Sequence, residues 1–495
     1  MPENPSRSTL DLLSTGVPGL DAVLGGGLPA LSFNLIAGGP GSGKTTLAMQ
    51  LLFANATPER PGLFLTLLGE TSLKMLRYQQ QFDFFDTSRV GADIHFLNLS
   101  EDVLAGDLDA VMARVVAEVG RLNPGVVVID SFRTLARLQI DASGADLALE
   151  HFVQRLALHL TTWDVTSFLV GEYLEQELRN PVFTVADGIL WLFQAVDRNS
   201  VVRKLQVLKM RGMASMPGLH TCRMTGAGVQ VFPRILERAD AVRTTRHARL
   251  STGVPDLDAM MGGGIPAGDA MVVGGPTGTG KTTFAAQFVA AGLRAGEASV
   301  IAVFEEHPAA YLERVTALGV DFRRAIAEGK LRIIYLRPLD LSVDETLEEI
   351  RDAVRKIGAT RVVIDSISGF EMALAPTYRE DFRESLYRLV SAVTGLGVTI
   401  VLTMEIGESS EGFAFTNYAI SFITDAIIVL RFVEMEGQLR KVLAVVKIRG
   451  SAHSLDFRAY DITSEGLRLG DYLHGYTGIS SGHPVLIARA PPEGA

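Results

Sequence analysis

Two glycine-rich stretches decide the fold of this chain: GGPGSGKT at residues 38–45 and GPTGTGKT at residues 275–282. Both fit the pattern G-x-x-x-x-G-K-T. Each stands between an apolar run and a helical pattern, which is the context that a phosphate-binding loop requires. Glycine lets backbone N–H groups turn inward around an anion, and the following helix offers its positive end to phosphates. A pair of ordinary glycine-rich turns is the alternative, and the agreement of two motifs in register argues against it.

The two loops predict ATP and Mg²⁺ as the bound cofactors. We expect Lys44 and Lys281 to reach the β- and γ-phosphates, and Thr45 and Thr282 to place a hydroxyl on Mg²⁺. The predicted ATP-binding residues are Gly41, Ser42, Gly43, Lys44, Thr45 and Thr46 in the first loop, and Gly278, Thr279, Gly280, Lys281, Thr282 and Thr283 in the second.

Both loops belong to an internal repeat. STGVPGLDAVLGGGLPA at residues 14–30 and STGVPDLDAMMGGGIPA at residues 251–267 agree at 13 of 17 positions, at an offset of 237. Further pairs follow in the same order: VVVIDS at 126–131 with VVIDS at 362–366, and LKMRG at 208–212 with VKIRG at 446–450. The chain is therefore a duplication of a unit of roughly 240 residues.

Short apolar, β-rich runs alternate with helical patterns in both halves. Leu63–Leu68 and Val126–Ile129 are such runs, and Ala110–Val119 and Leu147–Leu160 are such patterns. Continuous apolar strands are typical of a parallel sheet covered on both faces. We predict an α/β fold of two tandem P-loop domains, each a mainly parallel twisted sheet flanked by helices. Their predicted bounds are 1–240 and 241–480, with a short C-terminal tail at 481–495.

The seam between the halves, Pro233 to Arg249, is rich in arginine. Two interpretations stay open for it: a solvated linker, or a basic strap that contacts the other domain or a neighbouring subunit. The chain as a whole is acidic, with a net charge of −10 and a pI near 5.5. That balance argues against nucleic-acid binding that depends on neutralising phosphates.

Composition limits the class of protein further. Apolar residues make up 47% of the 495 residues, so sizeable cores can form. No apolar run reaches the roughly 18 residues that span a bilayer, and the polar start of the chain lacks the features of a signal peptide. Cys222 is the only cysteine, so no internal disulfide can form. These features predict a cytoplasmic protein without a membrane partner.

Acidic residues follow several of the predicted strands. Asp130 and Asp365 each end a strand, 86 and 84 residues after the loop lysines, where a carboxylate can hold Mg²⁺. Glu305 and Glu306 follow Val300–Phe304, and we interpret them as the carboxylates that orient the attacking water, with a charged strand end as the alternative.

The first half lacks one member of that carboxylate pair. When its strand end is aligned with that of the second half, Gly69 stands opposite Glu305, and Glu70 is the only candidate carboxylate left. The alignment therefore puts hydrolysis in the first half in doubt.

Two K-x-R pairs complete the candidate catalytic residues. Lys209 and Arg211 lie in one late strand-like run, and Lys447 and Arg449 lie in the other. Alternation in a strand directs Lys and Arg to the same face. The pairs are interpreted either as charges on a solvated edge strand or as cations delivered to the γ-phosphate of a neighbouring subunit.

The chain resembles the KaiC family of double-domain RecA-like ATPases over nearly all of both halves. The resemblance rests on STGVPGLD, on GGPGSGKTT and GGPTGTGKTT, on FEEHP at 304–308, on VVIDS, and on ITDAIIVLRFVE followed by VVKIRGS. It implies two RecA-like domains in a double-ring homohexamer with ATP at the subunit interfaces. It also implies that Glu305 is the catalytic carboxylate and that Lys447 and Arg449 act across the interface.

The resemblance further implies autophosphorylation in the second domain. Ser421 falls on the phosphoserine of the family, whereas Phe422 replaces its phosphothreonine. A switch at one site, Ser421, remains open, and an added phosphate at an interface would change ring packing. The family's long activator-binding tail is expected to be absent, because the sequence ends soon after GYTGISSGHPVLIAR.

Three hypotheses follow. The first is a KaiC-like ATPase of slow turnover, a serine/threonine autokinase in its second domain. The second is an ATP-gated hexameric scaffold for KaiB-like or other signalling proteins, which Gly69 motivates. The third is a RecA/RadA-like DNA-dependent ATPase, which the acidic balance disfavours.

Overall fold

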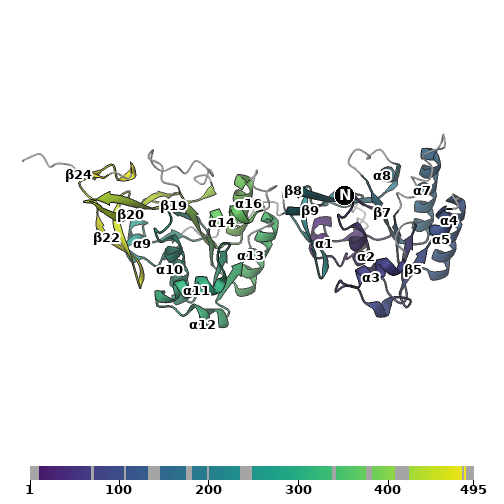
Figure 1. Ribbon diagram of the computed structural model, residues 1–495, viewed down its shortest axis with the longest axis horizontal. Coiled ribbons are helices and arrows are strands. Elements are labelled where there is room, and N and C mark those ends of the chain that lie inside the picture. Colours follow the sequence, from purple (N-terminus) through teal and green to yellow (C-terminus); the bar gives the residue numbers. More distant parts are fainter. Residues whose placement is uncertain are drawn as a thin grey trace, which may run out of the picture. The chain divides into compact units, whose positions relative to one another are not determined.

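The computed structural model describes most of the chain and divides it into two compact units, Met1–Arg234 and Ile235–Ala495 (Figure 1). The described residues are 10–67, 72–104, 108–131, 145–173, 181–197, 200–234, 248–336, 342–374, 382–406, 423–481 and 484–486.

A nine-stranded sheet forms the centre of the first unit, in the order β11-β10-β9-β8-β3-β7-β6-β4-β5. Its strands are β3 (Phe33–Gly38), β4 (Gly62–Thr66), β5 (Ile94–Asn98), β6 (Val126–Asp130), β7 (Thr166–Glu172), β8 (Gly188–Asp197), β9 (Ser200–Met210), β10 (His220–Thr225) and β11 (Gly228–Phe232). Strands β3 to β8 are parallel, and β9 to β11 continue the sheet antiparallel. The carboxyl ends of the parallel strands therefore meet at one edge.

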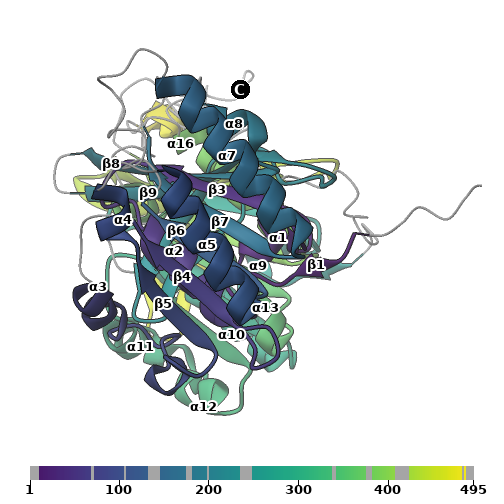
Figure 2. The same cartoon turned by 90° about the vertical axis from the view of Figure 1, so that its right-hand side faces the viewer.

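Helices cover both faces of this sheet because its strands are apolar on both sides. Val127 and Ile129 of β6 face the cluster that contains α5 and α7, whereas Val126 and Val128 face the cluster that contains α2. Figure 2 shows α5 and α7 lying across the near face of the strands. The helices of the unit are α1 (Leu20–Leu24), α2 (Lys44–Asn55), α3 (Ser72–Gln79), α4 (Ser100–Leu104), α5 (Leu108–Leu122), α7 (Ala145–Thr162) and α8 (Pro181–Val185).

The second unit repeats this sheet strand for strand, in the order β16-β15-β17-β18-β14-β19-β20-β21-β22. Its strands are β14 (Ala270–Gly275), β15 (Ser299–Val303), β16 (Leu331–Tyr335), β17 (Arg361–Asp365), β18 (Thr399–Glu405), β19 (Ala426–Met435), β20 (Gln438–Ile448), β21 (Arg458–Thr463) and β22 (Gly466–Tyr472). β14, which carries the second loop, pairs in parallel with β18 on one side and β19 on the other.

The helices of the second unit also form two layers. One core packs α9, α10, α11 and α12 against one face of the sheet, and the other packs α13, α14 and α16 against the opposite face. Their bounds are α9 (Pro255–Met260), α10 (Lys281–Arg294), α11 (Pro308–Val315), α12 (Phe322–Ala327), α13 (Val343–Ile357), α14 (Ile367–Ala373) and α16 (Phe382–Thr394). The prediction of two tandem RecA-like P-loop domains is confirmed.

Short elements complete both units. They are the strands β1 (Leu12–Leu13), β2 (Leu28–Pro29), β12 (Arg249–Leu250), β13 (Ile265–Pro266), β23 (Tyr476–Thr477) and β24 (Val485–Leu486), and the 3₁₀ turns η1 (Thr87–Arg89), η3 (Thr316–Leu318) and η5 (Ile479–Ser481).

A buried arginine distinguishes the second core from the first. Arg361, at the start of β17, is only 2% exposed, and its Nε lies 2.5 Å from Glu297 Oε2. Its Nη1 donates to the carbonyls of Ser251 and Phe288, at 2.8 and 2.9 Å. The ion pair and the hydrogen bonds offset part of the cost of burying this charge. Val126 begins the equivalent strand of the first unit, so this tie belongs to the second unit alone.

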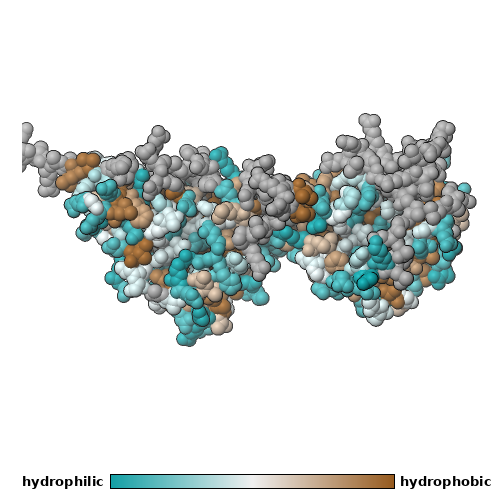
Figure 3. Space-filling model, in the orientation of Figure 1, coloured by the Kyte–Doolittle hydropathy of each residue, from teal (hydrophilic) through white to brown (hydrophobic). Residues whose placement is uncertain are grey.

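The surface of the described residues is mixed in character. Figure 3 shows apolar residues in separate patches among hydrophilic ones. Exposed examples are Leu439 at the start of β20 and Val485 and Leu486 in β24, each more than 60% exposed. Among the described residues, no helix is long and apolar enough to cross a membrane.

Candidate functional site

The first phosphate-binding loop connects the end of β3 to the start of α2. Gly41 and Gly43 adopt left-handed backbone conformations, with φ of 72° and 100°, which turn the loop back on itself. Lys44 Nζ donates to the carbonyl of Gly39 at 2.7 Å, and Ser42 Oγ donates to the same carbonyl at 2.8 Å. The loop is thus wrapped around its lysine, as the motif predicts for a loop that receives phosphate.

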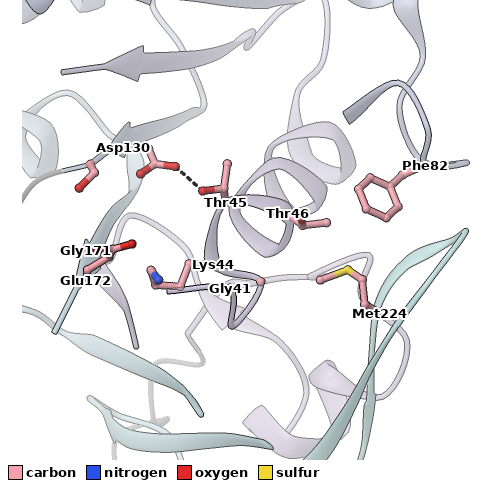
Figure 4. A pocket seen from close by; sticks show the side chains of 11 residues that line it. Gly41, Lys44, Thr45, Thr46, Phe82, Asp130, Gly171, Glu172 and Met224 are labelled. Carbon is pink, nitrogen blue, oxygen red and sulfur yellow. Dashed lines mark hydrogen bonds between the residues drawn. The ribbon is translucent and has the colours of Figure 1, made fainter. Parts of the chain in front are cut away.

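Beside this loop, a carboxylate and a hydroxyl form a candidate Mg²⁺ site. Thr45 Oγ1 donates to Asp130 Oδ2 at 2.6 Å (Figure 4). Among the described residues, no cluster of three or more His, Cys, Asp or Glu side chains could hold a metal by itself. Mg²⁺ usually keeps several waters and takes further oxygens from bound phosphates. One hydroxyl and one carboxylate therefore fit a metal that arrives with a nucleotide.

The pocket in front of the loop has a volume of about 370 Å³. Lys44, Thr45 and Asp130 line one part of it, and Phe82 and Met224 line the part beyond Thr46 (Figure 4). The sequence analysis missed Phe82 and Met224. An aromatic ring and a thioether are surfaces against which a nucleotide base can pack. No motif marks them, because Phe82 follows α3 and Met224 belongs to β10.

The second loop has the same construction between β14 and α10. Gly278 and Gly280 are left-handed, with φ of 84° and 92°. Lys281 Nζ donates to the carbonyls of Gly275 and Pro276, at 2.8 and 2.9 Å. Thr279 Oγ1 donates to the Pro276 carbonyl at 2.7 Å. In both loops, the predicted lysine is thus hydrogen-bonded to backbone carbonyls of its own loop.

Asp365 is held more firmly than its counterpart Asp130. Its Oδ1 accepts a hydrogen bond from Thr403 Oγ1 at 2.5 Å. Burial raises the pKa of Asp365, and hydrogen bonds from Thr403 and Thr282 oppose that rise. Val170 stands in β7 where Thr403 stands in β18, so Asp130 cannot have the corresponding hydroxyl.

Glu305 and Glu306 take different partners. Glu305 Oε1 accepts a hydrogen bond from Ser366 Oγ at 2.7 Å, directly after Asp365. Glu306 forms an ion pair with Arg314 of α11, and burial raises its pKa. Glu305 is therefore the member of the pair that faces the end of β17. Gly69 and Glu70 lie outside the described residues.

Tyr311 is a further residue that the sequence analysis missed. Its side chain is fully buried in α11, and its hydroxyl has no hydrogen-bond partner among the described residues. Burial raises its pKa, and the charges of Asp365 and Glu306 add to that rise. Met75 occupies the equivalent place in α3, so this polar group, too, is confined to the second unit.

In each domain, a glutamate that the sequence analysis missed ends the strand next to the one that carries the loop. Glu172 of β7 lies opposite Gly38, and Glu405 of β18 lies opposite Gly275. Burial lowers the pKa of Lys44, and Glu172 is the strongest opposing charge. Lys281 is affected in the same way, with Glu405 as its strongest opposing charge. Comparison of the two repeats was the signal that could have found them.

The K-x-R pairs lie at the other end of the sheets from the loops. Lys209 Nζ donates to the Thr184 carbonyl at 3.1 Å, and Arg211 pairs with Asp187 at 2.9 Å. In the second unit, Lys447 Nζ donates to the Thr424 carbonyl at 2.7 Å, and Arg449 pairs with Asp425 at 3.3 Å.

β9 and β20 each lie between two other strands, but the second neighbour does not reach the K-x-R residues: β10 pairs with β9 at residues 203–205, and β21 pairs with β20 at residues 442–443. The edge-strand interpretation therefore stays open beside the catalytic one. The middle residue of each motif, Met210 or Ile448, is buried. Two other predicted features, Ser421 and the arginines at 238–246, lie outside the described residues.

Comparison with known proteins agrees with this geometry. The family model described as "ATPase: KaiC" matches residues 13–235 and again residues 250–472. The chain is 29% identical over 495 residues to the circadian clock protein KaiC3 of Synechocystis sp., covering 98% of this chain and 96% of that protein.

Two further relatives are circadian clock oscillator proteins KaiC. The protein from Picosynechococcus sp. is 29% identical over 490 residues, with 96% of this chain and 93% of that protein covered. The protein from Prochlorococcus marinus is 30% identical over 497 residues, with 96% and 95% covered. The similarity thus spans both repeats of this chain.

Replacing Asp130 with asparagine should stabilise the nucleotide-free first unit at neutral pH. Burial raises the pKa of Asp130 to about 6 in the folded state, above the value of about 4 in the unfolded chain. Ionisation of Asp130 therefore destabilises the folded state more and more as the pH rises above about 4. At pH 7.5, Asp130→Asn should gain up to about 3 kcal/mol, and the gain should shrink as pH falls toward 4. Both tryptophans, Trp163 and Trp191, lie in the first unit, so their fluorescence follows its unfolding.

The exposed Asp11 supplies the control, since Asp11→Asn should leave stability unchanged at every pH. A gain that does not depend on pH, or a loss of stability at pH 7.5, would show that ionisation of Asp130 does not destabilise the nucleotide-free first unit.

Proposed function

The chain belongs to the KaiC family of ATPases, and from that premise we propose that it binds ATP in both domains and hydrolyses it slowly in the second. One observation carries this proposal. Glu305 is hydrogen-bonded to Ser366 at the end of β17, beside the second loop and Asp365. The first domain has Gly69 where the second has Glu305. The first site then holds ATP, with Glu70 as the candidate carboxylate that remains after the equivalent strand.

In this proposal the loops bind the phosphates and a threonine–aspartate pair holds the metal. Lys44 and Lys281 exchange loop carbonyls for phosphate oxygens, and the loop N–H groups bind the rest of the anion. Thr45 with Asp130, and Thr282 with Asp365, supply the protein ligands for Mg²⁺. Bound Mg²⁺ neutralises charge that develops on the phosphates.

Glu305 is the proposed residue that orients the attacking water. Glu305 is exposed, and among the described residues its carboxylate is held by the Ser366 hydroxyl alone, so it remains ready to accept a proton. Glu306 forms an ion pair with Arg314 of α11. We therefore assign it a supporting role, in which it holds α11 against the end of the strand. A general base must be free to reach the proton that it takes, which favours Glu305 over Glu306.

The positions of the K-x-R pairs support a site that is shared between copies of the chain. Asp425, the partner of Arg449, donates its backbone N–H to Ala270 at the start of β14, whereas the phosphate loop leaves the end of β14 at Gly275. Five residues of strand separate the two positions by about 16 Å. Lys447 and Arg449 would therefore serve the second loop of a neighbouring copy, and Lys209 and Arg211 would do so in the first domain.

Head-to-tail sharing gives a ring when the rotation between copies closes, and the form that we propose is a double-ring homohexamer. ATP held in the first domain would stabilise that ring by mass action. Gly69 favours this scaffold role as a second function, with KaiB-like or other signalling proteins as partners. We place this assembly in the cytoplasm.

Serine autophosphorylation is the remaining part of the proposal. Ser421 stands three residues before Thr424, whose carbonyl accepts the Lys447 hydrogen bond. Thr424 and Asp425 precede β19, which begins at the end of the sheet away from the chain's own second loop. The phosphoryl donor would therefore be ATP in a neighbouring copy, and Lys447 and Arg449 would lie near the new phosphate.

Mg-ATP hydrolysis by single-residue variants tests the main proposal. Glu305→Gln should lose at least about 100-fold in rate, because an amide cannot accept the proton. Glu306→Gln should retain far more activity, and Glu70→Gln should change little. Nucleotide binding, measured in parallel, should persist in all three. If Glu70→Gln removed most of the activity, the first domain would be the hydrolysing one.

Intact-mass analysis after incubation with Mg-ATP tests the autokinase. The wild-type chain should gain one phosphate, and both Ser421→Ala and Lys281→Ala should gain none. Thr424, which is 1% exposed, provides a matched control, because Thr424→Val should still be phosphorylated. A phosphate that persists in Ser421→Ala, or a wild type that gains none, would contradict this part of the proposal.

A further inference from the structure

We propose that the hydrogen bond between Thr277 and Glu405 is a latch that lowers the affinity of the second loop for ATP more than for ADP. The inference rests on the proposed function, because it assigns a nucleotide preference to the same site. It makes Glu405 and Thr277 positioning residues of the second domain.

The latch ties the loop to the neighbouring strand. Thr277 lies inside the loop and donates from Oγ1 to Glu405 Oε1 at 2.8 Å. Glu405 ends β18 opposite Gly275, and the next backbone N–H, that of Ile406, donates to the Gly275 carbonyl at 3.2 Å. A main-chain bond and a side-chain bond therefore fix the carboxylate beside the loop.

The charge of Glu405 acts on the lysine that the phosphates must reach. Lys281 is the cation of the loop, and Glu405, Asp365 and Glu305 all act on it electrostatically, in decreasing order. A phosphate that binds Lys281 is therefore brought close to Glu405, and like charges repel. ATP carries one more negative charge than ADP, so the same carboxylate penalises ATP more. Glu405 is exposed, so water and salt reduce this penalty to a modest size.

Thr277 determines where that charge is held. Without its hydroxyl, the exposed Glu405 side chain can rotate away from the loop, since among the described residues the Thr277 hydroxyl is the hydrogen-bond donor that holds the carboxylate. The first domain provides the natural comparison: Glu172 occupies the equivalent strand position, but Pro40 stands where Thr277 does. Proline has no side-chain donor, so the first loop cannot form this bond. The latch is thus specific to the domain in which we propose turnover.

A weaker hold on ATP in the second domain would let that domain exchange nucleotide while the first domain retains it. Two loops with the same motif would then differ in function: the first would retain its nucleotide, and the second would bind, hydrolyse and release it. The difference depends on a single hydroxyl in the loop, at a position where the motif G-x-x-x-x-G-K-T places no restriction.

Equilibrium binding of fluorescent ADP and a non-hydrolysable ATP analogue tests the latch. The full-length chain with Lys44→Ala is the parent, so that the second loop alone is measured. Glu405→Gln removes the repulsive charge and Thr277→Val releases it from the loop, so each should tighten the ATP analogue about 3- to 10-fold and ADP less than about 2-fold. The double variant should bind no more tightly than Glu405→Gln, and Thr277→Ser should match the parent.

Glu434→Gln is the control for the loss of one exposed charge, because Glu434 lies on β19 and should not affect either affinity. Unchanged or weaker ATP binding in Thr277→Val and Glu405→Gln would overturn the latch while leaving the proposed function intact. A wild-type chain that binds neither nucleotide would contradict the proposed function itself.

Discussion

The parallel order of the strands is the constraint on which both sites depend. Because β3 to β8 run in one direction, the phosphate loop, Asp130 and Glu172 all emerge at one edge of the first sheet. The second sheet does the same for its own loop, Asp365 and Glu405. Because β9 and β20 run antiparallel to their neighbours, each K-x-R pair lies where the parallel strands begin, at the opposite end from the loop. Each sheet thus places its phosphate loop and its K-x-R pair at opposite ends of the strands, which is the arrangement that the proposed head-to-tail sharing requires.

The two domains share this scaffold and differ in the polar groups placed on it. The second domain carries Glu305, Thr277, Thr403 and Tyr311 where the first has Gly69, Pro40, Val170 and Met75. Each replacement removes a carboxylate or a hydroxyl from the first site without disturbing the strand order. Small changes around an unchanged fold are the usual way in which a new function arises on an old framework. They fit a first domain that retains nucleotide and a second that consumes it.

Much of this could be read from the sequence, because the decisive signals are local. Gly38 to Thr45 predicts the loop and the helix after it, and the buried runs before Asp130 and Asp365 predict their strands. Glu172 and Glu405 could not be recognised in this way, since each only becomes a neighbour of its loop through strand pairing. The same holds for Phe82 and Met224, and for Arg361, whose charge in a β-strand gives no sign of burial.

The central claim is that a nucleotide site is completed by a second copy of the chain, and mixing two inactive variants tests it most directly. Lys281→Ala has a defective second loop but intact cations, whereas the double variant Lys447→Ala, Arg449→Ala has an intact loop but no cations. Each should hydrolyse ATP poorly alone. After dissociation and joint reassembly at equal amounts, about a quarter of the interfaces should pair an intact loop with intact cations, and activity should return in proportion. A mixture as inactive as its two components would show that loop and cations do not meet between subunits.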